Sequence, residues 1–349
     1  MSLTTALAAL AVLVIVALAV HGFWTTRRAE PRRALRDQAP APIERVEPSL
    51  GTASTPDGPA DDTTAVTLPT PPVRRVGPRI DALIDAIAPL AIEAPASGEM
   101  LLAHLPSSRR AGSKPFLVEG LGAASGEWEP LALGQRYSEL QAGVQLANRS
   151  GPLNEIEYSE FVQKLQAFAD AIGAVPDFPD MLDVVARARE LDAFASPHDA
   201  TLSVTLRANS VAWSVGYVQQ RALRHGFVAG PAAGRLVLPS AEEGAPPVLS
   251  LVFDAQAALA DDPAQAAVRQ LGLNFDVAQT PAAAEPFTAW QQAMRALGED
   301  MDASAVDERG QPLTVQHFAM IQGELAKLYD ALEARDMAAG SAAARRLFQ

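Results

Sequence analysis

The chain has 349 residues and a formal net charge of −13. This acidic balance argues against a nucleic-acid partner, because a protein that binds DNA or RNA needs clustered lysine and arginine to neutralise phosphates. The sequence contains no cysteine, which excludes disulfides, thiolate metal sites and a cysteine nucleophile, and which fits a reducing compartment.

The first predicted element is an apolar segment, Ala6 to Trp24, which as a helix would be long enough to cross a hydrocarbon core of about 30 Å. Arginines follow this segment, from Arg27 to Arg36, whereas a cleaved signal peptide carries its positive charges in front. We therefore expect residues 1–25 to be a transmembrane anchor with a periplasmic N-terminus and cytoplasmic domains after it. An A-x-A pattern at Ala17 supports the alternative of an exported, cleaved protein. The expected anchor residues are Leu7, Leu10, Leu13, Val14, Ile15, Val16, Leu18 and Trp24.

Residues 26–78 are predicted to be a linker, basic at first and then rich in proline, alanine, threonine and aspartate. This composition has no helical or strand periodicity and buries too little apolar area to offset the entropy of ordering, so we expect a disordered spacer. About 270 residues then remain to fold.

Residues 79–196 show a weak copy of the pattern that follows them. We expect strands at Ile80–Leu90, Lys114–Leu121 and Glu139–Ala147, and helices at Ser97–Leu105, Phe161–Ile172 and Met181–Leu191. This part is shorter between its last two helices than the part after it, so one hairpin strand there is expected to be reduced or missing.

Residues 197–349 show alternating strands and amphipathic helices. Leu202, Val204 and Leu206 alternate with polar residues in the first strand, and Thr314 is a plausible N-cap of the last helix. We expect strands at Ala200–Leu206, Gly234–Ser240, Pro246–Phe253 and Leu271–Ala278, and helices at Tyr217–Leu223, Phe287–Met301 and Phe318–Leu328.

The predicted fold class is α+β, with a split β-α-β antiparallel sheet that carries helices on one face. The repeated order favours two such domains in tandem, 79–196 and 197–349; the alternative is one larger α+β domain.

No motif in the sequence calls for enzyme chemistry. The histidines are scattered, HExxH and GxSxG are absent, and the glycine-rich turn Gly230–Gly234 lacks the lysine of a phosphate-binding loop. We therefore expect no catalytic residue, no metal, no cofactor and no small-molecule substrate.

Several segments of the C-terminal part resemble the ZipA family of bacterial cell-division proteins, which tether the tubulin-like polymer FtsZ to the inner membrane. The segments are ATLSVTL at Ala200, RHGF at Arg224, PPVLSLVF at Pro246, NFDVAQTP at Asn274 and VDERGQPLT at Val306. The resemblance also covers the order of anchor, basic patch and proline-rich linker. It implies a sheet with one open face, on which the C-terminal tail peptide of FtsZ binds mostly through apolar contacts.

The strand Pro246–Phe253 has apolar residues on both faces, although a sheet covered by helices on one side needs them on only one. The surplus could form a groove for a partner, or it could pack against the upstream part. The positions that the resemblance assigns to the open face are polar in the first and last strands, so the groove is more polar than the family's, or the peptide binds elsewhere. A basic peptide would tolerate Asp276. The candidate partner-binding residues are Leu249, Leu251, Phe253, Leu236, Thr201, Ser203, Thr205, Asn274 and Asp276.

The sequence thus predicts a non-enzymatic adaptor of the inner membrane that binds the FtsZ tail and stabilises the Z-ring during septum assembly. A single-pass membrane scaffold of the same fold, with a different cytoplasmic partner, is the alternative.

Overall fold

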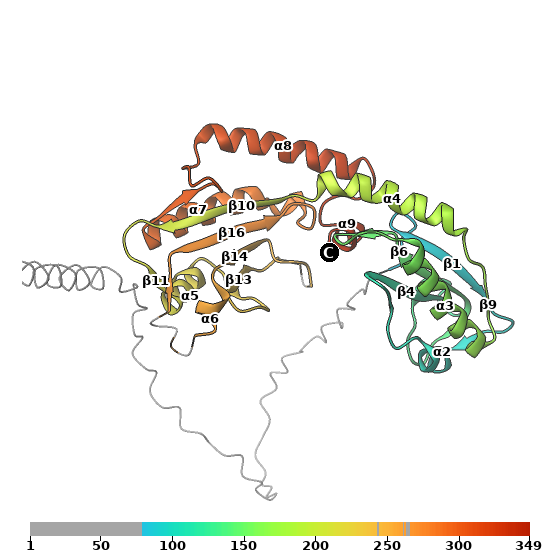
Figure 1. Ribbon diagram of the computed structural model, residues 1–349. Coiled ribbons are helices and arrows are strands. Elements are labelled where there is room, and N and C mark those ends of the chain that lie inside the picture. The colour runs from blue at the N-terminus through green and yellow to red at the C-terminus, as the bar shows by residue number, and fades with distance from the viewer. Residues whose placement is uncertain (1–78, 243, 261, 263–265) are drawn as a thin grey trace, which may run out of the picture. The chain divides into compact units, whose positions relative to one another are not determined.

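The computed structural model describes residues 79–242, 244–260, 262 and 266–349, which form helices and antiparallel sheets (Figure 1). The chain is therefore α+β, as predicted. The expected anchor, residues 1–25, and the expected linker, residues 26–78, lie outside the described residues. Within the described part, no helix is both long enough and apolar enough to span a bilayer.

The first sheet is seven-stranded, with the main strand order β3-β4-β6-β1-β9. Its long strands pair in antiparallel fashion, β6 lying between β4 and β1. The elements in chain order are β1 (Asp85–Ala91), β2 (Ala96–Ser97), α2 (Gly98–His104), β3 (Arg110–Ala111), β4 (Lys114–Gly122), β5 (Trp128–Pro130), β6 (Arg136–Gln145), β7 (Ala147–Asn148), β8 (Gly151–Pro152), α3 (Glu155–Ile172), β9 (Val175–Pro176) and α4 (Met181–His198).

The second sheet is six-stranded, with the order β12-β13-β14-β16-β10-β17. Here β16 lies between β14 and β10, again in antiparallel pairing. The elements are β10 (Thr201–Ala208), β11 (Trp213–Ser214), α5 (Val215–Arg224), β12 (Val228–Ala229), β13 (Arg235–Leu238), β14 (Leu249–Val252), α6 (Ala255–Ala258), β15 (Ala267–Val268), β16 (Gln270–Asp276), η1 (Ala282–Ala284), α7 (Pro286–Met301), β17 (Ala303–Val306), α8 (Val315–Glu333) and α9 (Ala342–Leu347).

Local signals in the sequence fix where the main helices begin and end. The Asn154 side chain caps α3 and accepts from the backbone of Glu157, while Gly173 ends the helix with a positive φ of 69°. Thr314 is the N-cap of α8, as predicted, and its backbone N–H donates to His317 Nδ1 at 3.2 Å.

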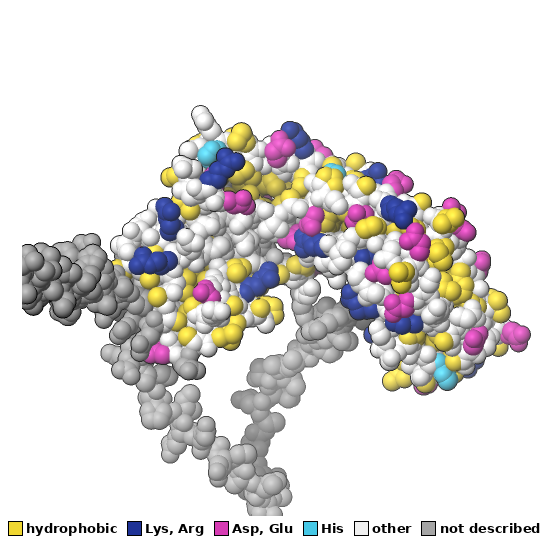
Figure 2. All heavy atoms as spheres, in the orientation of Figure 1, with side chains coloured by type: hydrophobic (Ala, Val, Ile, Leu, Met, Phe, Trp, Pro, Cys, Tyr) yellow, Lys and Arg dark blue, Asp and Glu magenta, His cyan; other side chains and the backbone are white. Residues whose placement is uncertain are grey.

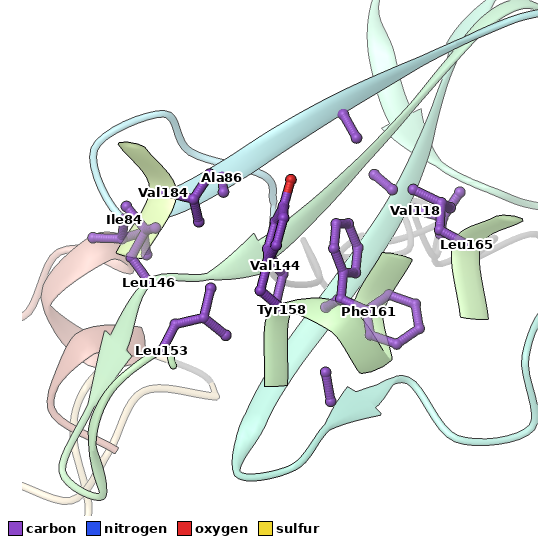
Figure 3. Close-up of a cluster of buried hydrophobic side chains, with 14 of the residues drawn as sticks. Ile84, Ala86, Val118, Val144, Leu146, Leu153, Tyr158, Phe161, Leu165 and Val184 are labelled. Atoms are coloured by element: carbon purple, nitrogen blue, oxygen red, sulfur yellow. The ribbon is translucent and has the colours of Figure 1, made fainter. Parts of the chain in front are cut away.

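Two hydrophobic cores hold these elements together. The first lies between one face of the first sheet and the helices α3 and α4; Val144, Phe161 and Val184 converge there (Figure 3). The second surrounds the buried indoles of Trp213 and Trp290.

The last residues of the chain belong to the first core, not to the second. Met337, Leu347 and Phe348 are at most 2% exposed and pack with the residues of the first sheet. A domain drawn as 197–349 therefore joins residues from two cores, because α9 returns to the part of the chain that was predicted as 79–196.

Candidate functional site

The second sheet has one face covered by helices and one face that they leave free. Val204 and Leu206 on β10 are buried in the second core together with Val218 of α5 and Leu297 of α7. Trp290 of α7 donates its indole N–H to the carbonyl of Leu273 on the central strand at 2.9 Å. Since side chains alternate between the faces of a strand, the residues between these apolar positions point to the free face.

The apolar candidates Leu236, Leu249, Leu251 and Phe253 lie on the covered face. Their exposed fractions are between 0 and 7%, and all four pack in the second core. The prediction that they line an open groove is therefore wrong. The pairing of Leu251 with both Leu236 and Leu273 places them on the same side of the sheet as α7.

The polar candidates lie together on the free face. Thr201 is opposite Asp276 and Ser203 is opposite Asn274 in the ladder between β10 and β16. The Ser203 hydroxyl donates to Asn274 Oδ1 at 2.6 Å. Thr205 continues the same row. This part of the free face is thus a surface of small, polar side chains, and the strands of the second sheet are largely white in Figure 2.

A cavity of about 360 Å³ lies at one end of this free face. Arg149 enters its wall from the loop after β7 and binds Asp276 at 2.5 Å and Asp199 at 2.6 Å. These hydrogen bonds hold the pKa of Arg149 above its ordinary value, although burial opposes them. The other charged residue of the wall is Arg235, whose Nη2 donates to Ser250 Oγ at 2.9 Å.

A second, apolar groove of about 590 Å³ runs between α8 and the start of β10. Leu202, Ile321 and Leu328 line it, and Figure 2 shows hydrophobic side chains along this strip beneath α8. The sequence did not predict this groove. The available signal was Met320, an apolar residue that lies off the helix's buried stripe and is 65% exposed.

On the first sheet, the face opposite the core is occupied by the chain itself. Gly143 lies under Ile80, and a Cβ at that glycine would be 2.8 Å from the Ile80 side chain. Arg79 Nε pairs with Glu119 Oε1 on the same face at 2.8 Å. The chain thus leaves less of this face open than it leaves on the second sheet.

The remaining polar cluster of note surrounds Lys114, which is fully buried. Its ammonium donates to Ser113 Oγ at 2.7 Å and to Asn148 Oδ1 at 2.8 Å, and Ser113 Oγ donates to Glu157 Oε1 at 2.7 Å. Burial lowers the pKa of Lys114. Because the Ser113 hydroxyl donates its hydrogen to the Glu157 carboxylate, we interpret the cluster as a structural network between β4 and the start of α3. Within the described ranges, no group of histidine, aspartate and glutamate side chains could hold a metal ion.

No protein-family model matches this sequence, and no curated protein is similar enough to it to indicate a family.

Proposed function

We propose that this protein is a membrane-anchored adaptor of bacterial cell division that binds the C-terminal tail of FtsZ on the free face of its second sheet. The observation that carries the proposal is the two-sided architecture of that sheet. Helices cover one face, and the opposite face presents Thr201, Ser203 and Asn274 to solvent on two neighbouring strands, β10 and β16. This is the arrangement that the resemblance to the ZipA family implies.

The finer fold assignment is a tandem pair of split β-α-β units. In each sheet, one long strand lies between the first strand and a middle strand. This strand is β6, between β1 and β4, in the first sheet and β16, between β10 and β14, in the second. Each first helix begins at a serine, Ser97 or Ser214, that also belongs to a two-residue strand and caps the helix. The strand after the second major helix is reduced to Val175–Pro176 in the first part and has four residues in the second.

This comparison supports one binding surface per chain. If the two parts are copies, then the face that takes a peptide in the second has its counterpart under Arg79 and Ile80 in the first. We assign partner binding to the second sheet alone. Three parts of the proposal are inferred from the sequence alone: the anchor at 1–25, the linker at 26–78 and the location at the inner membrane.

A scaffold of the same fold with a different cytoplasmic partner is the second candidate. The polarity of the free face favours it, because a peptide bound mainly by apolar contacts would find few here. Val252, which is 37% exposed, is the large apolar side chain that the central strands give to this face.

A binding titration separates the two candidates. A labelled FtsZ tail peptide is titrated with the full chain in nonionic micelles, and its fluorescence anisotropy is followed. Ser203→Glu places a bulky charged side chain on the free face, while Gln292→Glu places the same side chain on the exposed side of α7 as a matched control.

Saturable binding that Ser203→Glu abolishes and Gln292→Glu leaves intact supports the adaptor. Absence of binding by the unmodified chain at hundreds of micromolar peptide contradicts the tether mechanism and favours the scaffold.

A further inference from the structure

The free face of the second sheet carries two arginines that no acidic residue of the described chain neutralises. Arg207 projects from β10 and Arg235 from β13, and both are exposed. Thr205, Gly272, Val252 and Arg235 form one row across the strands. Arg207 stands one pleat further along β10, on the same face. The face is thus cationic in a chain whose net charge is −13.

Asp276, the acidic residue within the strands of this face, is itself paired with an arginine. Asp276 is held by Arg149 at 2.5 Å, and the same guanidinium also binds Asp199 at 2.6 Å. One guanidinium thus pairs with two carboxylates, so these three groups together keep one negative charge, against the two positive charges of Arg207 and Arg235. This changes the expectation from the sequence, in which Asp276 made the surface suitable for a basic peptide.

The cavity beside Arg235 has the polar lining needed to bind a polar group. Pro246 and Pro247 form one side of it, and Asn274 and Thr280 belong to the rest of the wall. Thr280 is 2% exposed, and its hydroxyl has no hydrogen-bond partner. A buried hydroxyl without a partner is costly, so the site is incomplete without a hydrogen-bonding ligand or water.

We propose that the free face of the second sheet binds an acidic, extended peptide segment of the partner, with one carboxylate at Arg235 and another at Arg207. This inference rests on the proposed function for its choice of surface and specifies the partner's chemistry. With strands about 4.8 Å apart and a rise of about 3.3 Å per residue, the two arginines are separated by about 16 Å. An extended segment that crosses the strands spans this distance in about five residues.

The chain offers one acidic segment of its own that could compete, Asp57 to Asp62 in the predicted linker. The partner is the better occupant on charge, because this segment has three acidic residues, and the arginines at 27–36 of the same predicted linker compete for them.

The experiment uses the absence of cysteine. A single Ser203→Cys substitution in the full chain, in nonionic micelles, takes an environment-sensitive dye on the free face, and Gln292→Cys takes the same dye on α7 as a control. Both are titrated with a short peptide of alternating glutamate and serine, with its glutamine and serine twin, and with the FtsZ tail peptide.

We expect the glutamate peptide to shift the dye at residue 203 and not at residue 292, and the glutamine twin to shift neither. Arg207→Gln and Arg235→Gln should each weaken the response by roughly threefold to tenfold, because they remove one charge-assisted contact. Arg295→Gln, which removes an exposed arginine from α7, should leave it unchanged. The effect should decline with added salt.

Two results would overturn the inference: equal responses from the glutamate and glutamine peptides, or a response to glutamate that neither arginine variant weakens. A response that emerges only after Asp57, Asp61 and Asp62 are replaced by asparagine would also overturn it, since the linker would then be the occupant. Failure of the FtsZ tail alone, with an arginine-dependent glutamate response, would refute the FtsZ assignment and leave the acidic partner standing. Binding of the FtsZ tail without any glutamate response would do the reverse.

Discussion

Replacing Arg346 by methionine should weaken the first sheet more than any surface substitution in the chain. Arg346 is 6% exposed and Asp85 1%. Two parallel hydrogen bonds join them, Nη2 to Oδ1 at 2.6 Å and Nη1 to Oδ2 at 2.8 Å. The variant leaves Asp85 with the backbone N–H of Asp81 as its remaining donor. Breaking a buried ion pair by removing one partner costs about 3–5 kcal/mol.

The loss should depend on pH in a defined direction. Burial raises the pKa of Asp85, and the hydrogen bonds and charge of Arg346 oppose that rise. Without Arg346 the pKa in the folded state moves higher still, so the folded variant takes up a proton more readily than the unfolded chain. The destabilisation should therefore be larger at neutral pH, where Asp85 is forced to be charged, than in mild acid.

Hydrogen exchange measured by mass spectrometry on the full chain is the suitable assay, because peptides from β1, β6 and α9 report the opening of this region. A loss of about 3 kcal/mol speeds exchange by about a hundredfold. Arg345→Met is the matched control: Arg345 pairs with Glu242 on the surface at 2.9 Å, and its loss should cost less than about 1 kcal/mol. Equal effects of the two substitutions, or no dependence on pH, would refute the reasoning.

Four further substitutions test three other features. Gly143→Ala should destabilise the first sheet by about 1–3 kcal/mol, since its methyl group would overlap Ile80, and faster exchange of β6 amides would show it. Glu157→Gln should flatten the loss of thermal stability in acid: burial would raise the pKa of Glu157, but its hydrogen bonds hold it below 4.5, so its contribution is present above that pH and lost as pH falls through the folded pKa; an unchanged acid limb of the melting temperature would contradict this. Phe253→Asp should cost more than about 3 kcal/mol because it buries a carboxylate in the core, whereas Val252→Asp, at an exposed position, should melt close to the unmodified chain.

The sequence identified most of the strands and helices because their periodicity is local. The alternation through Leu202, Val204 and Leu206 predicted β10. The recurrence of apolar residues every three or four positions, through Trp290 and Leu297, predicted α7. Both patterns are visible in the sequence because one face of each element packs in the core along its whole length.

The same periodicity could not say which face of the second sheet the helices cover. Residues that alternate share a face, but whether that face lies under α7 depends on the register between β14 and β16, which joins residues far apart in the chain. For this reason the prediction placed Leu249 and Leu251 on the same face as the polar candidates, although the two leucines lie on the covered face.

Features that rest on long-range contacts were missed for the same reason. The predicted strand Ile80–Leu90 begins only at Asp85, because residues 79–81 cross a sheet face before the strand starts. The six-residue helix α9 is too short to show a period, and its main ion pair joins residues 261 positions apart. The basic character of the free face was equally hidden, since only the structure shows that Arg207 and Arg235 share this face and that Asp276 is paired with Arg149.

The segment at residue 79 has a mechanical consequence. Arg79 is tied to β4 through Glu119, and its carbonyl accepts a hydrogen bond from Arg346 Nη1 at 2.7 Å. Tension that reaches residue 79 from the preceding chain is thus delivered to the first sheet and the C-terminal helix. Part of that load passes on to the end of β16, because Gln279 Nε2 donates to the carbonyl of Phe348 and the Gly340 N–H donates to the carbonyl of Ala278.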